Sequence, residues 1–400
     1  MQTADIEWIP EGTVFGEREL TWYSGRDERD LDDALADIDL IVTGPHAAAA
    51  FPEEMAPFVD LGLTRRLQFD FTDVSTSPVG RRWAEIDPHV LYIEDPHPRA
   101  VRDANRPRPD DILVDLRGAF ARLEAAPGER PSLTGVDAIR PVTFGYLPVL
   151  RKPVDDTEWD QLGTAFTKAG KQGVDPYERI RDSLIQRVIE AKMSRLASID
   201  PASATVEEWN SATHLDVLSL HDTMNHTAQP DGAICVERKP ADRLPQVVAL
   251  SNRGDANGEY RAASAIRSEI DVPTMRPARM RAIGQAYRMV FDAHGPDDVA
   301  YNRPYLGGHE TQLAGPMLRE LEPRCVVRTG DGPPRALELG AWQNEFLREF
   351  LLGDDAMNHL RQPGVDWVLP PDDRVQWLAE RLRDAHTLVR RWGAALDPVR

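Results

Sequence analysis

Short apolar runs alternate with amphipathic stretches along this chain. Residues 40–43 (Leu-Ile-Val-Thr) and 90–93 have the length and composition of buried strands, and residues 215–221 form a longer apolar run. Residues 177–197 carry apolar side chains at the three- and four-residue spacing of an amphipathic helix. Strands that alternate with helices in this way predict an α/β fold in a single domain, with a mixed, mostly parallel sheet flanked by helices.

The same patterns divide the rest of the chain. They predict further strands at 246–250 and 336–339, and further helices at 79–86, 113–125, 258–270, 279–294 and 372–396. We expect an N-terminal extension at 1–35, a main domain at 36–355 and a C-terminal helical extension at 356–400. Within the main domain, residues 106–175 are expected to form an elaborated loop region, because much of this stretch is rich in proline and aspartate.

Composition narrows the possible functions. The chain has 400 residues, and its formal net charge is −19, so binding to the phosphates of nucleic acid is not expected. No stretch approaches eighteen consecutive apolar residues, and the N-terminus has no export signal. The sequence therefore predicts a cytoplasmic protein that does not bind membranes and whose two cysteines stay free. It makes no prediction of the oligomeric state.

Polar residues follow or interrupt three of the predicted strands. His46 and His221 come at strand ends, and Glu338 lies in the short strand 336–339. Ligands of open α/β sheets bind at the carboxyl ends of strands, where histidines and carboxylates suit a Zn²⁺ site with a position left for water. The alternative is that each histidine forms hydrogen bonds within its own loop, which is the commoner role of a single histidine at a strand end.

Five segments, taken in order, resemble segments of the N-formylglutamate amidohydrolase family. They are Val-Thr-Gly-Pro-His at 42–46 with Phe-Pro at 51–52; Phe-Thr-Asp at 71–73; the Arg-x-x-x-Asp-x-Asn-Arg pattern at 99–106; Leu-Ser-Leu-His at 218–221; and a C-terminal block of Tyr-Leu-Gly-Gly-His-Glu-Thr at 305–311 and Ala-Leu-Glu-Leu at 336–339. The resemblance spans residues 40–350. It implies a fold akin to that of the zinc carboxypeptidases and the hydrolysis of an amide bond.

The resemblance also implies roles for the residues of the catalytic centre. His46, Asp73 and His221 would hold Zn²⁺, which leaves one position for water. Glu338 would act as the general base, and Arg99 would stabilise the oxyanion. From the residues alone, Asp73 is also a candidate helix N-cap, because serines and a proline follow it.

A second group of residues would bind the substrate. Asn105 and Arg106 would grip its α-carboxylate, and Thr311 and Gln312 would line the pocket. Gln312 stands where the family usually has an arginine, so a second carboxylate on the substrate loses an expected partner. Asp70, three positions before Asp73, is an alternative metal ligand.

The expected substrate is a small N-acyl amino acid or a small peptide. A peptidase or tailoring amidase on the same scaffold is an alternative, and so is a binding protein of this fold without catalytic activity.

Overall fold

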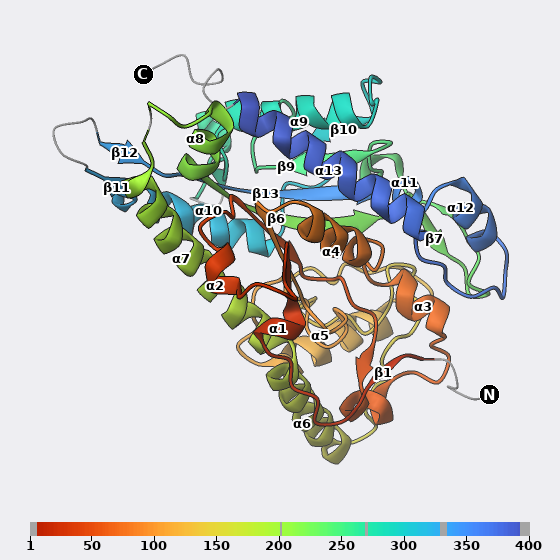
Figure 1. Cartoon of the computed structure of the whole chain (residues 1–400). Coiled ribbons are helices and arrows are strands. Elements are labelled where there is room, and N and C mark those ends of the chain that lie inside the picture. The colour runs from red at the N-terminus through yellow and green to blue at the C-terminus, as the bar shows by residue number, and fades with distance from the viewer. Residues whose placement is uncertain (1–5, 201, 269–270, 329–333, 393–400) are drawn as a thin grey trace.

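A seven-stranded sheet runs through the middle of the molecule (Figure 1). The computed structural model describes residues 6–200, 202–268, 271–328 and 334–392. The order of the strands across the sheet is β10-β9-β13-β6-β3-β5-β2. In chain order they are β2 (Thr21–Tyr23), β3 (Leu40–Gly44), β5 (Val90–Glu94), β6 (His214–Thr223), β9 (Val248–Ser251), β10 (Val299–Tyr301) and β13 (Glu338–Leu347). The expectation of an α/β fold is confirmed.

The strands of this sheet do not share one direction. β13, β6, β3 and β5 are parallel to one another. β9 runs antiparallel to β13 with β10 parallel to β9, and β2 runs antiparallel to β5. The sheet is therefore mixed, and the expectation of a mostly parallel sheet is wrong. The four central strands still bring their carboxyl ends to one edge, which is where such sheets bind ligands.

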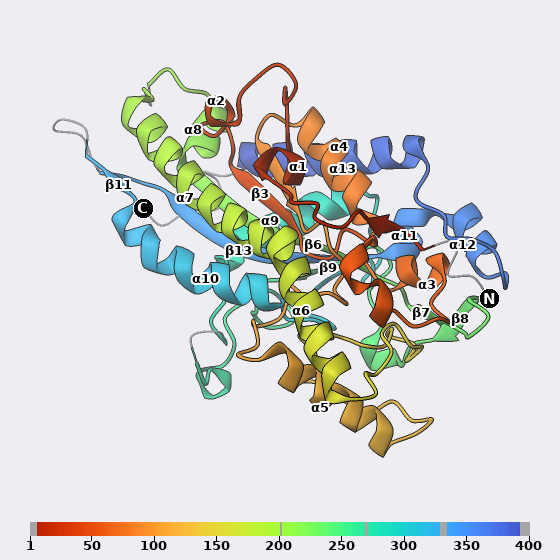
Figure 2. The same ribbon diagram turned by 90° about the horizontal axis from the view of Figure 1, so that it is seen from below.

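Helices cover both faces of the sheet (Figures 1 and 2). One layer consists of α4 (Thr76–Ile86), α9 (Pro277–Val290) and α13 (Asp372–Trp392). The other contains α7 (Val174–Ser198) and α10 (His309–Leu321). Side chains alternate along each strand, so Leu40 and Val42 pack with the first layer, whereas Ile41 packs with the second. The sheet is thus buried on both faces.

The sheet face under α7 and α10 changes from apolar to polar along the strands. Apolar side chains such as Val217 and Ala341 occupy this face first, and polar side chains replace them toward the carboxyl ends of the central strands. These buried polar residues are Thr43, Ser219, His221, Gln343 and Glu345. Because buried polar groups require partners, this change marks the part of the sheet where a site can be built.

Residues 106–175, expected to form an elaborated loop region with a helix at 113–125, contain that helix as α5 (Ile112–Ala125) and a second helix that was not predicted, α6 (Asp156–Gln172). Figure 2 shows them beside each other, away from the central sheet. Their apolar side chains pack with α3 (Arg65–Asp70) and the 3₁₀ helix η1 (Glu53–Phe58) in a separate apolar cluster. This region therefore forms a subsidiary layer with its own core, joined to the sheet through α7.

The two predicted extensions are integral to the sheet and its helical layers. β2 supplies an edge strand, and α13 packs against α4 and α9. Arg390 at the end of α13 forms buried ion pairs with Asp39 (2.8 Å) and Asp87 (3.1 Å). The boundaries expected at residues 35 and 356 are therefore not boundaries between separately packed parts.

Two other predicted elements differ in the structure. The helix expected at 258–270 is absent from the described part of that range, where only the short 3₁₀ helix η3 (Ala263–Ala265) forms. Of the strand expected at 336–339, Ala336 belongs to β12 (Arg335–Ala336), and Glu338 and Leu339 begin the much longer β13. Residues 393–396 of the expected C-terminal helix lie outside the described residues.

Shorter elements complete the chain. Two-stranded sheets form from β1 and β4, from β7 and β8, and from β11 and β12. These and the remaining short elements are β1 (Trp8–Ile9), α1 (Glu17–Leu20), α2 (Leu31–Ala34), β4 (Phe51–Pro52), α8 (Val206–Thr213), β7 (His226–Ala228), β8 (Ile234–Glu237), η2 (Pro240–Asp242), η5 (Glu322–Arg324), β11 (Val326–Val327), β12 (Arg335–Ala336), α11 (Arg348–Leu352) and α12 (Asp354–Leu360).

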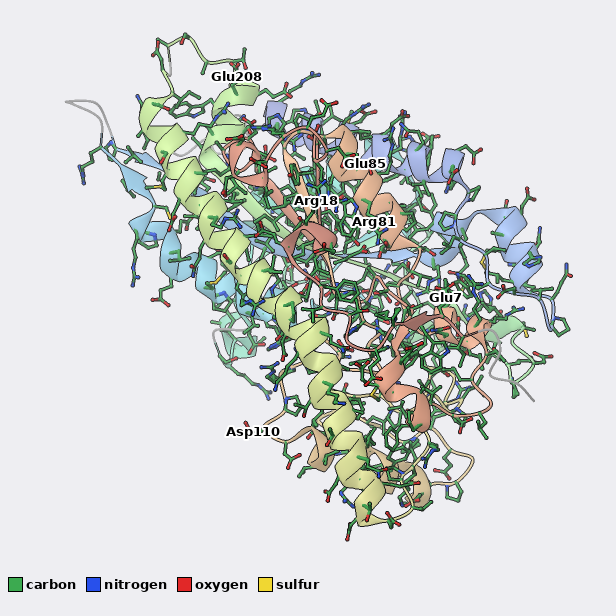
Figure 3. All side chains as sticks on the ribbon, turned by 60° about the horizontal axis from the view of Figure 1, so that its bottom comes forward. Glu7, Arg18, Arg81, Glu85, Asp110 and Glu208 are labelled. Atoms are coloured by element: carbon green, nitrogen blue, oxygen red, sulfur yellow. The ribbon has the colours of Figure 1, made fainter. Side chains whose placement is uncertain are left out.

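Charged side chains lie on the outer surface, among them Arg18 and Glu208, which are labelled in Figure 3. Within the described ranges, no helix has both the length and the apolar character needed to cross a bilayer. Cys235 is exposed and Cys325 is buried, and both are free thiols.

Candidate metal centre

Three buried residues from distant parts of the chain converge at the carboxyl end of the sheet: His46, Asp73 and His221. Asp73 Oδ2 lies 2.8 Å from His221 Nδ1 and 3.2 Å from His46 Nδ1. The two imidazole rings are 4.9 Å apart, centroid to centroid. One ligand atom from each residue lies within 4.8 Å of the others, which is close enough for all three to bind one metal ion. The structure thus brings together the three residues predicted to hold a metal.

Backbone contacts fix the positions of these side chains. His46 follows directly after β3, and its carbonyl oxygen accepts a hydrogen bond from the Asp73 N–H at 2.9 Å. Asp73 lies in the turn between α3 and α4, whose N-cap is Ser75, so the alternative role of Asp73 as that N-cap is not observed. His221 lies on β6, on the face covered by α7 and α10. Local backbone structure therefore orients each of the three residues toward the centre.

Asp103 determines which nitrogen of His46 faces the centre. Asp103 Oδ1 lies 2.7 Å from His46 Nε2 and also accepts a hydrogen bond from the Asn105 N–H. Because a carboxylate only accepts hydrogen bonds, Nε2 carries the proton, and Nδ1 is the nitrogen available to a metal. A carboxylate behind a histidine ligand is a common feature of metal sites. Asp103 belongs to a segment that carries the family resemblance, but the sequence alone gave it no role.

Ser219 plays the corresponding role behind His221. Its hydroxyl lies 2.9 Å from His221 Nε2 and donates a hydrogen bond to Glu310 Oε2 at 2.8 Å. Asn105 Nδ2 approaches the same nitrogen at 3.2 Å, so Ser219 and Asn105 together occupy Nε2. This again leaves Nδ1 directed at Asp73. Both histidines therefore present the same nitrogen to the centre.

Glu310 is fully buried beneath the centre and was not predicted. Besides Ser219, its carboxylate accepts hydrogen bonds from Thr43 (2.6 Å), Tyr177 (2.6 Å) and Arg181 (2.7 Å). Burial alone would raise the pKa of Glu310, but the Arg181 charge and these hydrogen bonds hold it below the ordinary value. The carboxylate thus stays ionised and ties β3, β6, α7 and α10 together under the histidines.

Arg99 is the cation of the centre. Its Nη2 contacts His46 Nδ1 and lies 3.1 Å from Asp73 Oδ1. Burial and the Arg99 charge both act to lower the pKa of His46, but Asp103 and Asp73 outweigh them and raise it. Burial acts to raise the pKa of Asp73, and the Arg99 and His46 charges hold it well below its usual range. The centre therefore combines the Arg99 cation with the buried carboxylates of Asp73 and Asp103, and Asp73 stays ionised.

Glu338, the predicted general base, does not lie in this cluster. It begins β13, where it pairs with His214 (3.2 Å) and Arg276 (2.9 Å). The residue of β13 that pairs with His221 is Glu345, seven positions further along, or about 23 Å at about 3.3 Å per residue. Glu345 is buried on the same face as His221 and accepts hydrogen bonds from Thr223 (2.6 Å) and Gln343 (2.8 Å). The glutamate beside the centre is therefore Glu345.

The residues predicted to bind substrate are distributed around the cluster. Asn105 Nδ2 lies 3.2 Å from His221 Nε2, and its Oδ1 accepts the Glu310 N–H, so its amide is used within the protein. Arg106 is half-exposed and pairs with Asp137 at 2.9 Å. Thr311 is buried in the first turn of α10, and Gln312 follows it, half-buried. Gln312 is therefore present on the helix beneath the centre but makes no contact that ties it to the three residues.

Asp70, the alternative ligand, is not one of the three clustered residues. Its side chain lines a small cavity that Thr223 and Arg348 also line. Thr223 hydrogen-bonds Glu345, and Arg348 Nη2 lies 3.7 Å from Asp73 Oδ1. The cavity thus adjoins both the carboxylate of the centre and the neighbouring glutamate.

No protein-family model, no curated protein and no solved structure matches this chain. The resemblance to the N-formylglutamate amidohydrolase family therefore stays a prediction.

Proposed function

We propose that this protein is a zinc-dependent amide hydrolase that removes an N-acyl group, such as formyl, from an amino acid or a related small amide. One observation carries the proposal: Nδ1 of two buried histidines faces the same carboxylate of Asp73, while Asp103 and Ser219 occupy Nε2 of each ring. As a result, one potential ligand atom from each of His46, Asp73 and His221 lies within 4.8 Å of the others.

The donor set fits the proposed metal. Two imidazole nitrogens and one carboxylate are ligands that Zn²⁺ accepts at catalytic sites, where a position stays open. When bound, Zn²⁺ supplies a Lewis acid and lowers the pKa of a coordinated water toward ~7. Arg99 Nη2 now contacts His46 Nδ1 and lies 3.1 Å from Asp73 Oδ1, whereas Asp73 Oδ2 faces the two histidines, so Arg99 would have to leave His46 Nδ1 for a metal to take that nitrogen. The guanidinium is then free to stabilise negative charge that develops on the substrate oxygen.

Glu345 is the residue of the chain best placed to act as general base. We assign it the proton of the attacking water, which it then donates to the leaving nitrogen, so that one amide bond is exchanged for a carboxylate and an amine. Thr223 and Gln343 each donate to one of its oxygens, which fixes the orientation of the carboxylate. This role replaces the one predicted for Glu338.

The test combines metal content with turnover. Protein dialysed against Zn²⁺ is expected to retain about one equivalent by elemental analysis, and His46→Ala is expected to lose it. A panel of N-formyl and N-acetyl amino acids, with dipeptides alongside, is then assayed for release of the free amine. Absence of zinc from the dialysed wild-type protein would overturn the metal site, and zinc without turnover on any amide would overturn the enzymatic proposal.

The role of Glu345 has a matched control on the same strand. Glu345→Gln is expected to retain zinc and lose ~10²–10⁴-fold in kcat, because glutamine cannot accept the proton. Glu338→Gln changes the same atoms at the other end of β13 and is expected to leave kcat within a few-fold of wild type. If instead Glu338→Gln gives the larger loss, the assignment of the base from the strand register is wrong.

A further inference from the structure

The small cavity beside the centre contains two charged side chains, Arg238 and Asp70, that form no ion pair with any residue the structure describes. Its volume is about 50 Å³, which corresponds to a few water molecules or one small polar group, and its walls include Asp70, Phe144, Thr223, Arg238, Tyr305 and Arg348. Thr223 and Tyr305 connect it to the proposed base, because Thr223 hydrogen-bonds Glu345 and Tyr305 is close enough for the Glu345 charge to affect its pKa.

Arg238 is the first of these groups. Its Nη2 donates to the Tyr305 hydroxyl at 3.0 Å, and its Nη1 lies 3.5 Å from the Met224 carbonyl oxygen. Among the residues that the structure describes, no carboxylate pairs with it. A half-buried guanidinium without a counter-ion is costly, and its planar fork matches a carboxylate. Arg106, predicted for the same purpose, already pairs with Asp137.

Asp70 is the second group. Over the described ranges, neither oxygen of its side chain has a hydrogen bond or an ion pair. Arg348 approaches only its backbone carbonyl and is itself paired with Asp222. Burial raises the pKa of Asp70 to about 6, and the Arg348 and Arg66 charges oppose this only in part. Asp70 is thus ionised at neutral pH and offers two free acceptors to the cavity.

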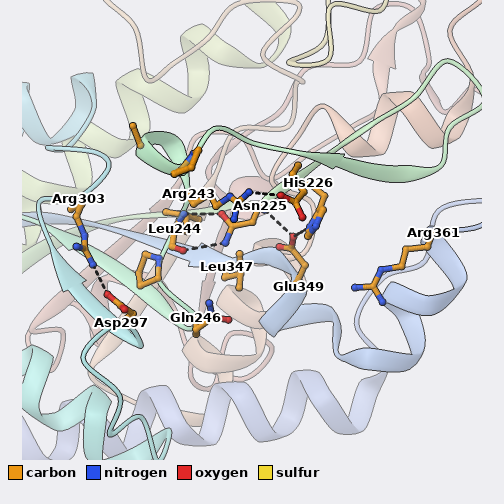
Figure 4. Close-up of a pocket in the computed structure, with 14 residues that line it drawn as sticks. Asn225, His226, Arg243, Leu244, Gln246, Asp297, Arg303, Leu347, Glu349 and Arg361 are labelled. Carbon is orange, nitrogen blue, oxygen red and sulfur yellow. Dashed lines mark hydrogen bonds and ion pairs between the residues drawn. The ribbon is translucent and has the colours of Figure 1, made fainter.

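A larger groove of about 590 Å³ lies nearby and shares His226 with the small cavity (Figure 4). Two of its arginines are already paired, Arg243 with Glu237 and Arg303 with Asp297. Neither cavity is lined by Glu345 or by any of the three clustered residues, but two walls of the small cavity reach them: Thr223 hydrogen-bonds Glu345, and Arg348 lies 3.7 Å from Asp73. The small cavity is therefore the better candidate for recognition at the reacting bond.

We propose that this cavity is the specificity pocket of the proposed hydrolase: Arg238 binds the single carboxylate of an N-acyl amino acid, and Asp70 selects a side chain that carries a hydrogen-bond donor or a positive charge. The inference rests on the proposed function. Under this proposal, N-acyl amino acids with acidic side chains are poor substrates, because their second carboxylate would face Asp70. A substrate with a single carboxylate does not need the arginine that the resemblance led us to expect at Gln312.

N-formyl-L-glutamine and N-formyl-L-glutamate test the role of Asp70, since they have nearly the same shape and differ in charge. At pH 8 the wild-type protein is expected to favour the glutamine derivative by at least ~10-fold in kcat/KM. Asp70→Asn is expected to bring this ratio close to one. A wild-type preference for the glutamate derivative, or a ratio that Asp70→Asn leaves unchanged, would overturn the inference while leaving the hydrolase intact.

Arg238→Met tests whether Arg238 binds the substrate carboxylate. It is expected to raise KM by ~10- to 100-fold for substrates with a free carboxylate and much less for their carboxamides. Arg303→Met, from the larger groove, is the matched control and should leave KM unchanged, because Arg303 pairs with Asp297 and has no contact with Arg238. The inference is wrong if Arg106→Ala gives this pattern and Arg238→Met does not.

Should no amide be hydrolysed, the proposed function fails and the pocket is tested by calorimetry with free L-glutamine and L-glutamate. Tighter binding of glutamine that is lost in both Asp70→Asn and Arg238→Met would support the pocket. Equal affinities, or no heat from either amino acid, would overturn it.

Discussion

Asp103 gives the sharpest test of how the centre is held. Its carboxylate lies 2.7 Å behind His46 Nε2, at 4 % exposure, and so orients the ring whose Nδ1 faces the other two proposed ligands. Asp103→Ala removes this acceptor together with the one that the Asn105 N–H uses. Loss of such a carboxylate behind a metal ligand typically costs 10–100-fold in metal affinity.

The two available substitutions separate orientation from charge. Asp103→Asn keeps an oxygen that can accept the Nε2 hydrogen and removes only the charge, so we expect ~10-fold weaker zinc binding, or about 1.4 kcal/mol. Asp103→Ala removes both, so we expect ~100-fold weaker binding, or about 2.7 kcal/mol. Asp103→Ala must weaken zinc binding more than Asp103→Asn does if the orientation of the His46 ring contributes as well as the charge of Asp103.

The assay is competition for Zn²⁺ against a chromophoric chelator at fixed pH, with unfolding by urea measured on each variant to exclude loss of the fold. Asp137→Asn is the control, because Asp137 pairs with Arg106 and has no contact with His46. Zinc affinities of both Asp103 variants equal to that of wild type would refute the reasoning. So would an equal loss in Asp137→Asn, since that would indicate a general effect of charge near the centre.

Two further predictions concern stability and do not depend on the proposed activity. Arg390→Met leaves the buried Asp39 and Asp87 without their cation, so we expect a loss of ~3–5 kcal/mol in the urea-derived free energy of unfolding, against a negligible change for the exposed Arg391→Met. Burial lowers the pKa of His386 to about 3 from its ordinary 6.5, so the unfolded chain binds the additional proton between these values. The free energy of unfolding should therefore fall with falling pH across that window, by up to ~1.4 kcal/mol per pH unit, and more gently in His386→Phe.

Much of the central fold could be predicted because its central strands are rich in apolar residues. The segments at 40–43, 90–93 and 215–221 are buried on both faces, so their composition alone marks them. Strand direction was not predictable in the same way. β9 and β2 run against their neighbours, and no local feature of a short apolar strand encodes which way it inserts into a sheet.

Glu345 was not recognised as a candidate because only the first residues of β13 were predicted as a strand. Trp342, Phe346 and Phe350 are spaced four apart, which fits the helical period of 3.6 and is also a multiple of the strand period of two. Read as a helix, this stretch hides Glu345. Read as a strand, it separates Trp342 and Phe346 on one face from Gln343 and Glu345 on the other, and a buried glutamate at that position becomes a candidate.

The supporting carboxylates could not be predicted, because their partners lie far away along the chain. In the sequence, Glu310 is an acidic residue in the first turn of a helix. Acidic residues are common there because the helix dipole stabilises them, so this position suggests no further role. The actual partners of Glu310 include Thr43 and Tyr177, 267 and 133 positions away. Asp103 likewise reaches His46 across 57 positions. Ionised groups this deeply buried are stable only when the fold supplies opposite charges and hydrogen bonds around each of them. The sequence can therefore indicate the three residues that cluster, whereas the residues that orient them emerge only once β3, β6, α7 and α10 have packed.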